Sequence, residues 1–198
     1  RDDTVTVFLA KAKREAVFDP NGGTLRTHVM GTDHWTGTKD PNKQVITWVG
    51  ATTVGADGTS VYYETRAGEG VEAKHMHLER TGYRTTGWDA TNRFGDELGQ
   101  DEWSGKMIEA GGTYTARWEP IECAVTLDPN GGSGGTASVR ATYDQVLPAA
   151  SMPVRPGFKF EGYYDSPTGG TCYYRSDGQP VTAWDKDQDK CTLYAFWT

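Results

Sequence analysis

The sequence predicts a β-dominated α+β fold built from two tandem modules, and three observations lead to this prediction. The 198-residue chain contains 25 Gly, 9 Pro, 7 Trp, 10 Tyr and 6 Phe, a composition typical of short strands joined by tight turns. Three blocks of sequence occur twice in the same order, which indicates an internal repeat. Long amphipathic helical patterns are absent, which disfavours a Rossmann sheet or a barrel enzyme.

The first repeated block is Asp-Pro-Asn-Gly-Gly, which stands at residues 19–23 and again at residues 128–132. Proline fixes φ near −65° for an early turn position, and Asn-Gly accepts the positive φ values that follow. An apolar strand pattern precedes each copy. Each module is therefore expected to open with a strand and a sharp reversal.

Two further blocks follow in each copy. Residues 80–88 match 155–163, with aromatic residues recurring along a predicted strand. Residues 113–118 match 192–197, and both show the period-two pattern of a closing strand with one buried face.

These blocks predict repeat module one over residues 14–119 and repeat module two over residues 120–198. Residues 1–13 are interpreted as the closing strand of a preceding repeat or as a linker, because 6–12 resemble the third block. On this view the segment was cut from a longer array, and its neighbours would be further repeats of the same chain.

Module one is longer because of an insertion at about residues 28–70. Two strand patterns within it, at 44–49 and 60–64, could build an extra hairpin. In module two we expect a short helical turn within residues 145–153, limited by its prolines. Each module is thus predicted to hold a mostly antiparallel or mixed sheet with at most one short helix.

Charge and hydropathy disfavour two classes of partner. With 20 Lys and Arg against 27 Asp and Glu, the chain has a formal net charge of −7, whereas nucleic-acid binders need clustered cations. No apolar run approaches the ~18 residues needed to span a bilayer, and no signal peptide pattern is visible at Arg1. We therefore expect a mature or trimmed segment with no nucleic-acid partner and no membrane insertion.

The order of these motifs resembles the Listeria and Bacteroides repeat family, including the B repeats of internalin-type proteins. The resemblance rests on Asp-Pro-Asn-Gly-Gly, on Leu147-Pro148 with Arg155-Pro156-Gly157-Phe158, on Gly162-Tyr163-Tyr164 and on the closing strand that ends at Trp197. Module two matches over nearly its whole length. Module one matches at both ends and departs in the insertion and at Thr81.

The resemblance implies small β-grasp-like modules, strung in tandem on bacterial proteins that are secreted or attached to the cell wall. It implies a spacer or adhesion module at the cell surface and no catalysis, and the family offers no catalytic residues to carry over. The sequence itself also argues against an enzyme, because it offers no combination of a base, a nucleophile and a group to orient them. We therefore predict a protein that is not an enzyme and uses no cofactor.

Aromatic residues of the insertion are the candidates for ligand binding. Trp35 and Trp48 are the rings least explained by the repeat, and with Tyr62 they are the candidates to contact a glycan or a host or neighbouring-cell protein, because exposed rings could stack on sugars. The alternative is core packing, because small cores depend on large rings. A carbohydrate- or host-protein-binding module is therefore the second candidate function.

Metal binding has two weak candidates. His75 and His77 would share one face of a strand, but a third ligand is not evident, so we assign no metal site. Residues 185–189 copy the first ligand positions of a calcium loop but lack its Gly and its bidentate Glu, which favours a solvated turn.

Cys172 and Cys191 flank a hairpin-sized segment. A disulfide between them would close a loop of about 20 residues, worth roughly 3 kcal/mol in the chain-entropy model. The alternative is that these residues and Cys123 are free thiols.

Overall fold

The structure is a computed structural model. It describes the chain in the following ranges: 14–29, 35–36, 44–48, 52–54, 60–66, 70–92, 94–99, 107–108 and 112–198. The strand predicted within residues 1–13 lies outside the described residues. Two compact units form: Arg1–Glu79 with Thr85–Arg117, and Arg80–Arg84 with Trp118–Thr198.

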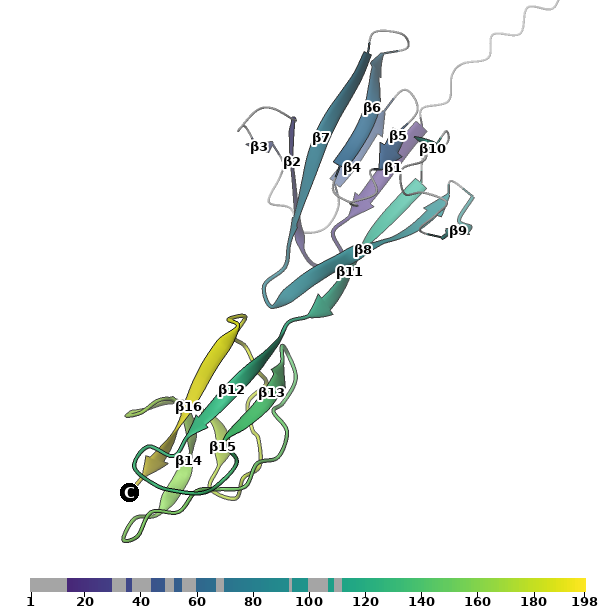
Figure 1. Cartoon of the computed structure of the whole chain (residues 1–198). Helices are drawn as coiled ribbons and strands as arrows, with labels where there is room; N and C mark the ends of the chain where they lie inside the picture. The colour runs from purple at the N-terminus through teal and green to yellow at the C-terminus, as the bar shows by residue number, and fades with distance from the viewer. Residues whose placement is uncertain are drawn as a thin grey trace, which may run out of the picture. The chain divides into compact units, whose positions relative to one another are not determined.

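The first unit contains a five-stranded sheet with the order β4-β1-β11-β8-β9 (Figure 1). β1 runs parallel to β11, with Phe18 opposite Tyr114, and antiparallel to β4. The strand bounds are β1 (Arg14–Asp19), β4 (Gln44–Trp48), β8 (Tyr83–Asn92), β9 (Glu97–Leu98) and β11 (Gly112–Pro120).

A six-stranded sheet of the first unit has the order β10-β5-β6-β7-β2-β3. Its bounds are β2 (Thr24–Val29), β3 (Trp35–Thr36), β5 (Thr52–Val54), β6 (Ser60–Arg66), β7 (Gly70–Glu79) and β10 (Met107–Ile108). The two strands predicted in the insertion correspond to β4 and β6. The hairpin expected between them is wrong, because β4 pairs with β1 whereas β6 pairs with β5 and β7.

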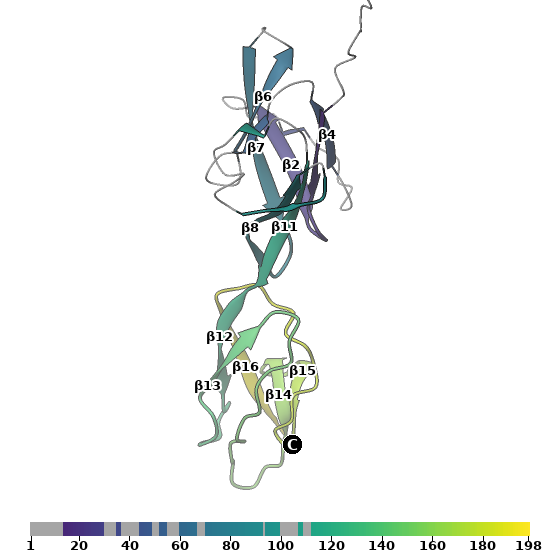
Figure 2. The same cartoon turned by 90° about the vertical axis from the view of Figure 1, so that its right-hand side faces the viewer.

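The second unit contains a five-stranded sheet with the order β13-β12-β16-β14-β15 (Figures 1 and 2). β12 runs parallel to β16, with Leu127 opposite Leu193, and every other pairing is antiparallel. The bounds are β12 (Glu122–Asp128), β13 (Ser138–Thr142), β14 (Phe160–Ser166), β15 (Gly169–Arg175) and β16 (Lys190–Trp197). The β-dominated class is confirmed.

The described residues contain no helix, so the helical turn expected within residues 145–153 is wrong. Val146 forms a bridge with Ala183, and Ser151 O accepts the N–H of Thr136 at 3.0 Å. Two prolines remove backbone donors here and favour extended conformations in the residues before them. The segment is therefore an extended connection, anchored by the buried Leu147.

The Asp-Pro-Asn-Gly-Gly turn of the second unit is tied to the closing strand. Asn130 has φ 45°, and its backbone N–H donates to Asp128 Oδ1 at 2.8 Å. The side-chain amide of Asn130 donates to Ala195 O of β16 at 2.9 Å and to Pro167 O at 3.2 Å. One asparagine therefore satisfies the turn and links it to a strand 65 residues away.

The turn of the first unit has the same local geometry. Asn21 has φ 48°, its N–H donates to Asp19 Oδ1 at 2.8 Å, and its side-chain amide donates to Ala116 O of β11 at 3.0 Å. In both turns the residue after Asn is a glycine with φ above 80°.

Aromatic rings are the largest buried side chains of both cores. In the first unit Phe18 stacks on Tyr114 with the ring centroids 4.7 Å apart, and Trp88 meets Phe18 edge-on at 5.4 Å. In the second unit the largest fully buried side chains are aromatic: Tyr163, Tyr173, Tyr174 and Trp184. Burial raises the pKa of these three tyrosines to about 12, so they stay neutral at physiological pH.

The turn asparagine should make a measurable contribution to stability. We expect Asn130→Ala to lower the free energy of unfolding by about 2 kcal/mol, because two hydrogen bonds are lost and alanine disfavours positive φ. Asn130→Gly loses the same bonds but accepts the backbone angle, and should cost about 1 kcal/mol less. Urea denaturation measures both, and equal losses would show that the backbone angle contributes nothing.

Candidate binding surfaces

The turn between β7 and β8 belongs to the second compact unit. The N–H of Tyr83 donates to Arg80 O at 3.0 Å, and Gly82 takes φ 75°, which its missing side chain permits. The Arg80 guanidinium lies over the Tyr83 ring, 3.9 Å from its centroid. Arginine, glycine and tyrosine together form one compact surface.

That surface is covered by other residues of the same unit. The Tyr143 ring lies directly against Gly82, where a Cβ atom would collide with it, and meets the Tyr83 ring edge-on at 5.6 Å. The Tyr83 hydroxyl donates to Asp144 Oδ2 at 2.7 Å, which raises the pKa of Tyr83. The N–H of Ile121 donates to Gly82 O at 2.8 Å.

A second turn of this kind lies before β14. The N–H of Phe158 donates to Arg155 O at 3.1 Å, Gly157 takes φ 80°, and the Arg155 guanidinium lies 3.9 Å from the centroid of the Phe158 ring. Phe158 is 49% exposed and Val154 66%. The turn borders a groove of about 360 Å³ that is lined mainly by apolar residues: Pro153, Val154, Arg155, Pro156, Phe158, Phe160 and Trp197.

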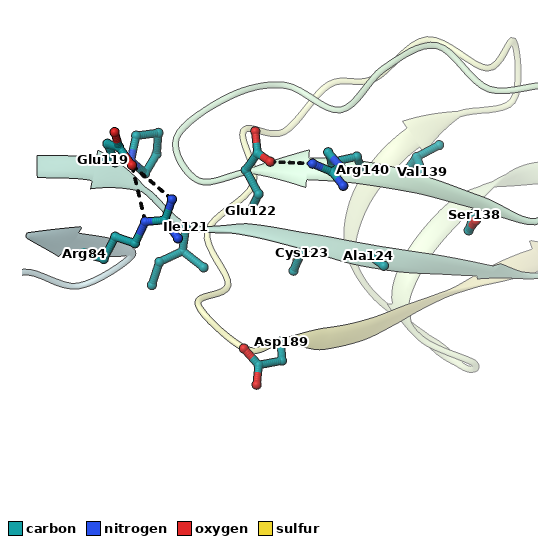
Figure 3. Close-up of a pocket in the computed structure, with 11 residues that line it drawn as sticks. Arg84, Glu119, Ile121, Glu122, Cys123, Ala124, Ser138, Val139, Arg140 and Asp189 are labelled. Carbon is teal, nitrogen blue, oxygen red and sulfur yellow. Dashed lines mark hydrogen bonds and ion pairs between the residues drawn. The ribbon is translucent and has the colours of Figure 1, made fainter. Parts of the chain in front are cut away.

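A larger groove of about 960 Å³ follows β12 and the edge strand β13 (Figure 3). Two ion pairs border it, Arg84 with Glu119 at 3.0 Å and Arg140 with Glu122 at 2.8 Å. These pairs are largely exposed, so each contributes less than about 1 kcal/mol. Because each arginine is paired with a glutamate, the groove carries both charges and has no cluster of positive charge that would attract an anion.

A charged network stabilises the loop before β16. Lys186 Nζ contacts Asp165 Oδ2 at 3.2 Å, and the Tyr173 hydroxyl donates to Asp185 Oδ1 at 2.6 Å. Burial would raise the pKa of Asp165, but the Thr171 N–H and Lys186 outweigh it and lower that pKa. Residues 185–189 resemble the start of a calcium loop, but they place the Lys186 ammonium group between the carboxylates of Asp165 and Asp185.

The cysteines are free thiols. Cys172 lies in β15 and Cys191 in β16, with β14 between them, so two strand spacings of ~4.8 Å exceed the ~7 Å that a disulfide spans between Cα atoms. The structure therefore gives no support to the bridge suggested by the sequence. Cys191 instead adjoins Cys123 of the neighbouring strand β12, and burial raises the pKa of both thiols.

The predicted ligand-binding aromatics fall on three different strands. Trp35 belongs to β3 and Trp48 to β4, each at the edge of its sheet, whereas Tyr62 belongs to β6 inside the six-stranded sheet. Their side chains lie outside the described residues, so the proposed ligand site stays a prediction. Two other tryptophans, Trp88 and Trp184, are core residues.

The two histidines considered for a metal both lie in β7. His77 Nε2 contacts Glu79 Oε1 at 2.9 Å, and the side chain of His75 is outside the described residues. Within the parts of the chain that the structure describes, no group of three or more His, Cys, Asp or Glu is arranged to hold a metal ion. Those parts also hold no helix that could cross a membrane.

The sequence showed that residues 80–88 and 155–163 match, but it predicted strands there and missed both the turns and the cover that Tyr143, Asp144 and Ile121 provide for the first of them. The repeated Arg-x-Gly-aromatic pattern was the available signal. The covering residues lie about 40 to 60 positions later in the sequence and leave no local pattern, so the sequence alone could not identify them.

Residues 124–196 match the family model of the Listeria-Bacteroides repeat domain. Residues 124–196 of the second unit are therefore similar to the repeats of this family, and the resemblance drawn from its motifs is confirmed over that stretch. The matched residues include nearly all of the β13-β12-β16-β14-β15 sheet. Searches of curated proteins and of solved structures found no match.

The Asp165–Lys186 contact predicts a dependence of stability on pH. Because folding lowers the pKa of Asp165, its ionised form stabilises the fold above the unfolded value near 3.8, and this contribution is lost as pH falls through the folded value. We expect Asp165→Asn to cost about 1 kcal/mol at pH 7 and progressively less below pH 4. Thermal unfolding from pH 3 to 7 measures this, with the exposed Asp187→Asn as the control; a loss independent of pH would contradict it.

Proposed function

We propose that the chain is a pair of β-grasp-like repeats of a bacterial secreted or cell-surface protein, and that it acts as a non-catalytic spacer that presents an adhesive region. The observation that carries this proposal is the equivalence of two sheets. The orders β4-β1-β11-β8-β9 and β13-β12-β16-β14-β15 correspond strand by strand, and in each the first and last strands of the module lie parallel at its centre.

The equivalence extends to individual residues. Phe18 lies opposite Tyr114 in one parallel pair, and Leu127 lies opposite Leu193 in the other. In both modules the turn asparagine donates to the carbonyl of an alanine two residues beyond the second member of that pair. Such agreement supports one repeat in two copies, with an extended connection in place of the expected helix and with extra strands inserted into module one.

A spacer needs units that fold around their own cores, because it must keep its length without help from a ligand. Both units contain such a core, one centred on Phe18, Trp88 and Tyr114 and the other on Tyr163 and Trp184. The match of residues 124–196 to a family of bacterial repeats supports a location at the cell surface.

Surface display tests the spacer role. The chain is fused after Thr198 to a wall anchor, with an epitope before Arg1, and antibody binding to whole cells is measured. We expect deletion of residues 120–198 to reduce binding severalfold, because the epitope sits nearer the wall, and a second copy of these residues to restore it. Unchanged binding after the deletion would overturn the proposal.

The second candidate is a module that binds a glycan or a host or neighbouring-cell protein through the insertion. The observation that favours it is the placement of Trp35 and Trp48 on edge strands, whose outer backbone groups can pair with a partner. We expect Trp35→Ala or Trp48→Ala to reduce binding to a glycan array or to host cells at least ~10-fold, as loss of a central aromatic anchor does. The control Trp88→Phe alters a core ring, and equal binding by all variants would exclude this function.

A further inference from the structure

We propose that the turn Arg155–Phe158 is the docking site for a following repeat module. That module would cover Gly157 with an aromatic ring and donate a backbone N–H to its carbonyl, as Tyr143 and Ile121 do for Gly82. This inference rests on the proposed tandem repeat and names the surface through which the second module binds its successor.

The first support is that the two turns share their backbone geometry and their pairing of an arginine with an aromatic ring. Gly82 and Gly157 have φ values of 75° and 80°. Their closing hydrogen bonds measure 3.0 and 3.1 Å, and in both an arginine guanidinium lies 3.9 Å from the centroid of the aromatic ring. A partner that fits one turn therefore finds the same backbone and the same cation–ring pair on the other.

The second support is that only the first turn is covered. A Cβ atom at Gly82 would collide with the Tyr143 ring, whereas a Cβ atom at Gly157 would find nothing within 4 Å. Phe158 and Val154 add exposed apolar surface beside Gly157. The open space at Gly157, bordered by apolar side chains, can accept an aromatic side chain of a partner.

The third support is the direction of the closing strand. The N–H of Lys159 donates to Thr198 O at 2.9 Å and the N–H of Thr198 donates to Lys159 O at 3.0 Å. The alignment of the two turns pairs Lys159 with Arg84, and the alignment of the closing strands, in which Trp197 matches Trp118, pairs Thr198 with Glu119. Because Ile121 stands two residues after Glu119 and reaches Gly82 O, a residue two positions after Thr198 would reach Gly157 O.

These positions define the chemistry of the partner. It carries a backbone N–H two residues beyond the closing strand, and an aromatic side chain that occupies the place of Tyr143. A carboxylate like that of Asp144 is dispensable, because Phe158 lacks the hydroxyl through which Tyr83 binds it. A further repeat of the same type as residues 120–198 meets these requirements.

The test extends the full chain by a second copy of residues 120–198 joined directly after Thr198, under reducing conditions. Amide hydrogen exchange is followed by NMR. We expect the amide of the appended copy of Ile121 to exchange at least ~10-fold more slowly than in the same chain carrying Gly157→Asn. Asparagine tolerates the positive φ of the turn, but its side chain occupies the space needed by the appended ring.

Three comparisons make the result specific. Gly134→Asn is the matched control, because Gly134 also has a positive φ and open space, and it should leave the exchange unchanged. Gly82→Asn should expose the native Ile121 amide in the same way as Gly157→Asn exposes the appended one. Phe158→Tyr should slow the exchange further, because it restores a hydroxyl for the appended copy of Asp144.

The proposal is overturned if the appended Ile amide exchanges equally fast with Gly157 and with Gly157→Asn, while the appended β12 and β16 amides remain protected. That outcome would leave the turn for a separate partner or for solvent. It would not affect the spacer function, because flexibly joined modules still increase epitope display. Loss of display with retained protection would instead reject the spacer role and keep the docking site.

Discussion

The hydrogen bond from the turn asparagine to the closing strand is the constraint on which each module depends. Asn130 follows the first strand of its module, and its amide binds the carbonyl of Ala195 in the last strand. This bond links the first strand of the module to its last strand and so favours the parallel pairing of β12 with β16. Asn21 makes the equivalent bond to Ala116.

The extended connection between β13 and β14 follows from the small core. The hydroxyl of the buried Tyr174 donates to Pro148 O at 2.6 Å, and Leu147 inserts its side chain beside the aromatic rings. In a helix the Pro148 carbonyl would accept a backbone N–H of the helix, and the Tyr174 hydroxyl would lose this acceptor. The module therefore covers its apolar face with an extended segment in place of the helical turn expected within residues 145–153.

Local patterns predicted much of the fold. The Asp-Pro-Asn-Gly-Gly turns and the closing strands have short-range signals, since turn residues and alternation act over a few positions. Pairing of the insertion strands was not predictable, because β4 and β6 carry similar patterns yet join different sheets. The same limit applies to Cys172 and Cys191: their separation in sequence suggests a bridge, but strand order places β14 between them.

The site was predicted less fully than the fold. The repeated segments around Gly82 and Gly157 were visible, although they were interpreted as strands. What covers such a turn depends on which distant side chain packs against it, and Tyr143 has no sequence pattern that distinguishes it from other tyrosines after a strand. For the aromatic residues of the insertion the sequence suggested a single binding site. The strands that carry them, β3, β4 and β6, are not neighbours in a sheet, so strand pairing does not bring these residues together.

The parallel neighbours β12 and β16 also determine how a module would respond to mechanical tension. A pull on the two ends of the module acts along both strands in opposite directions, so the hydrogen bonds between Ala124–Asp128 and Lys190–Tyr194 are loaded in shear and must break together. In a hairpin pulled apart at its open end, the bonds break one after another at much lower force. A module with this strand order is therefore suited to resist tension applied at its two ends.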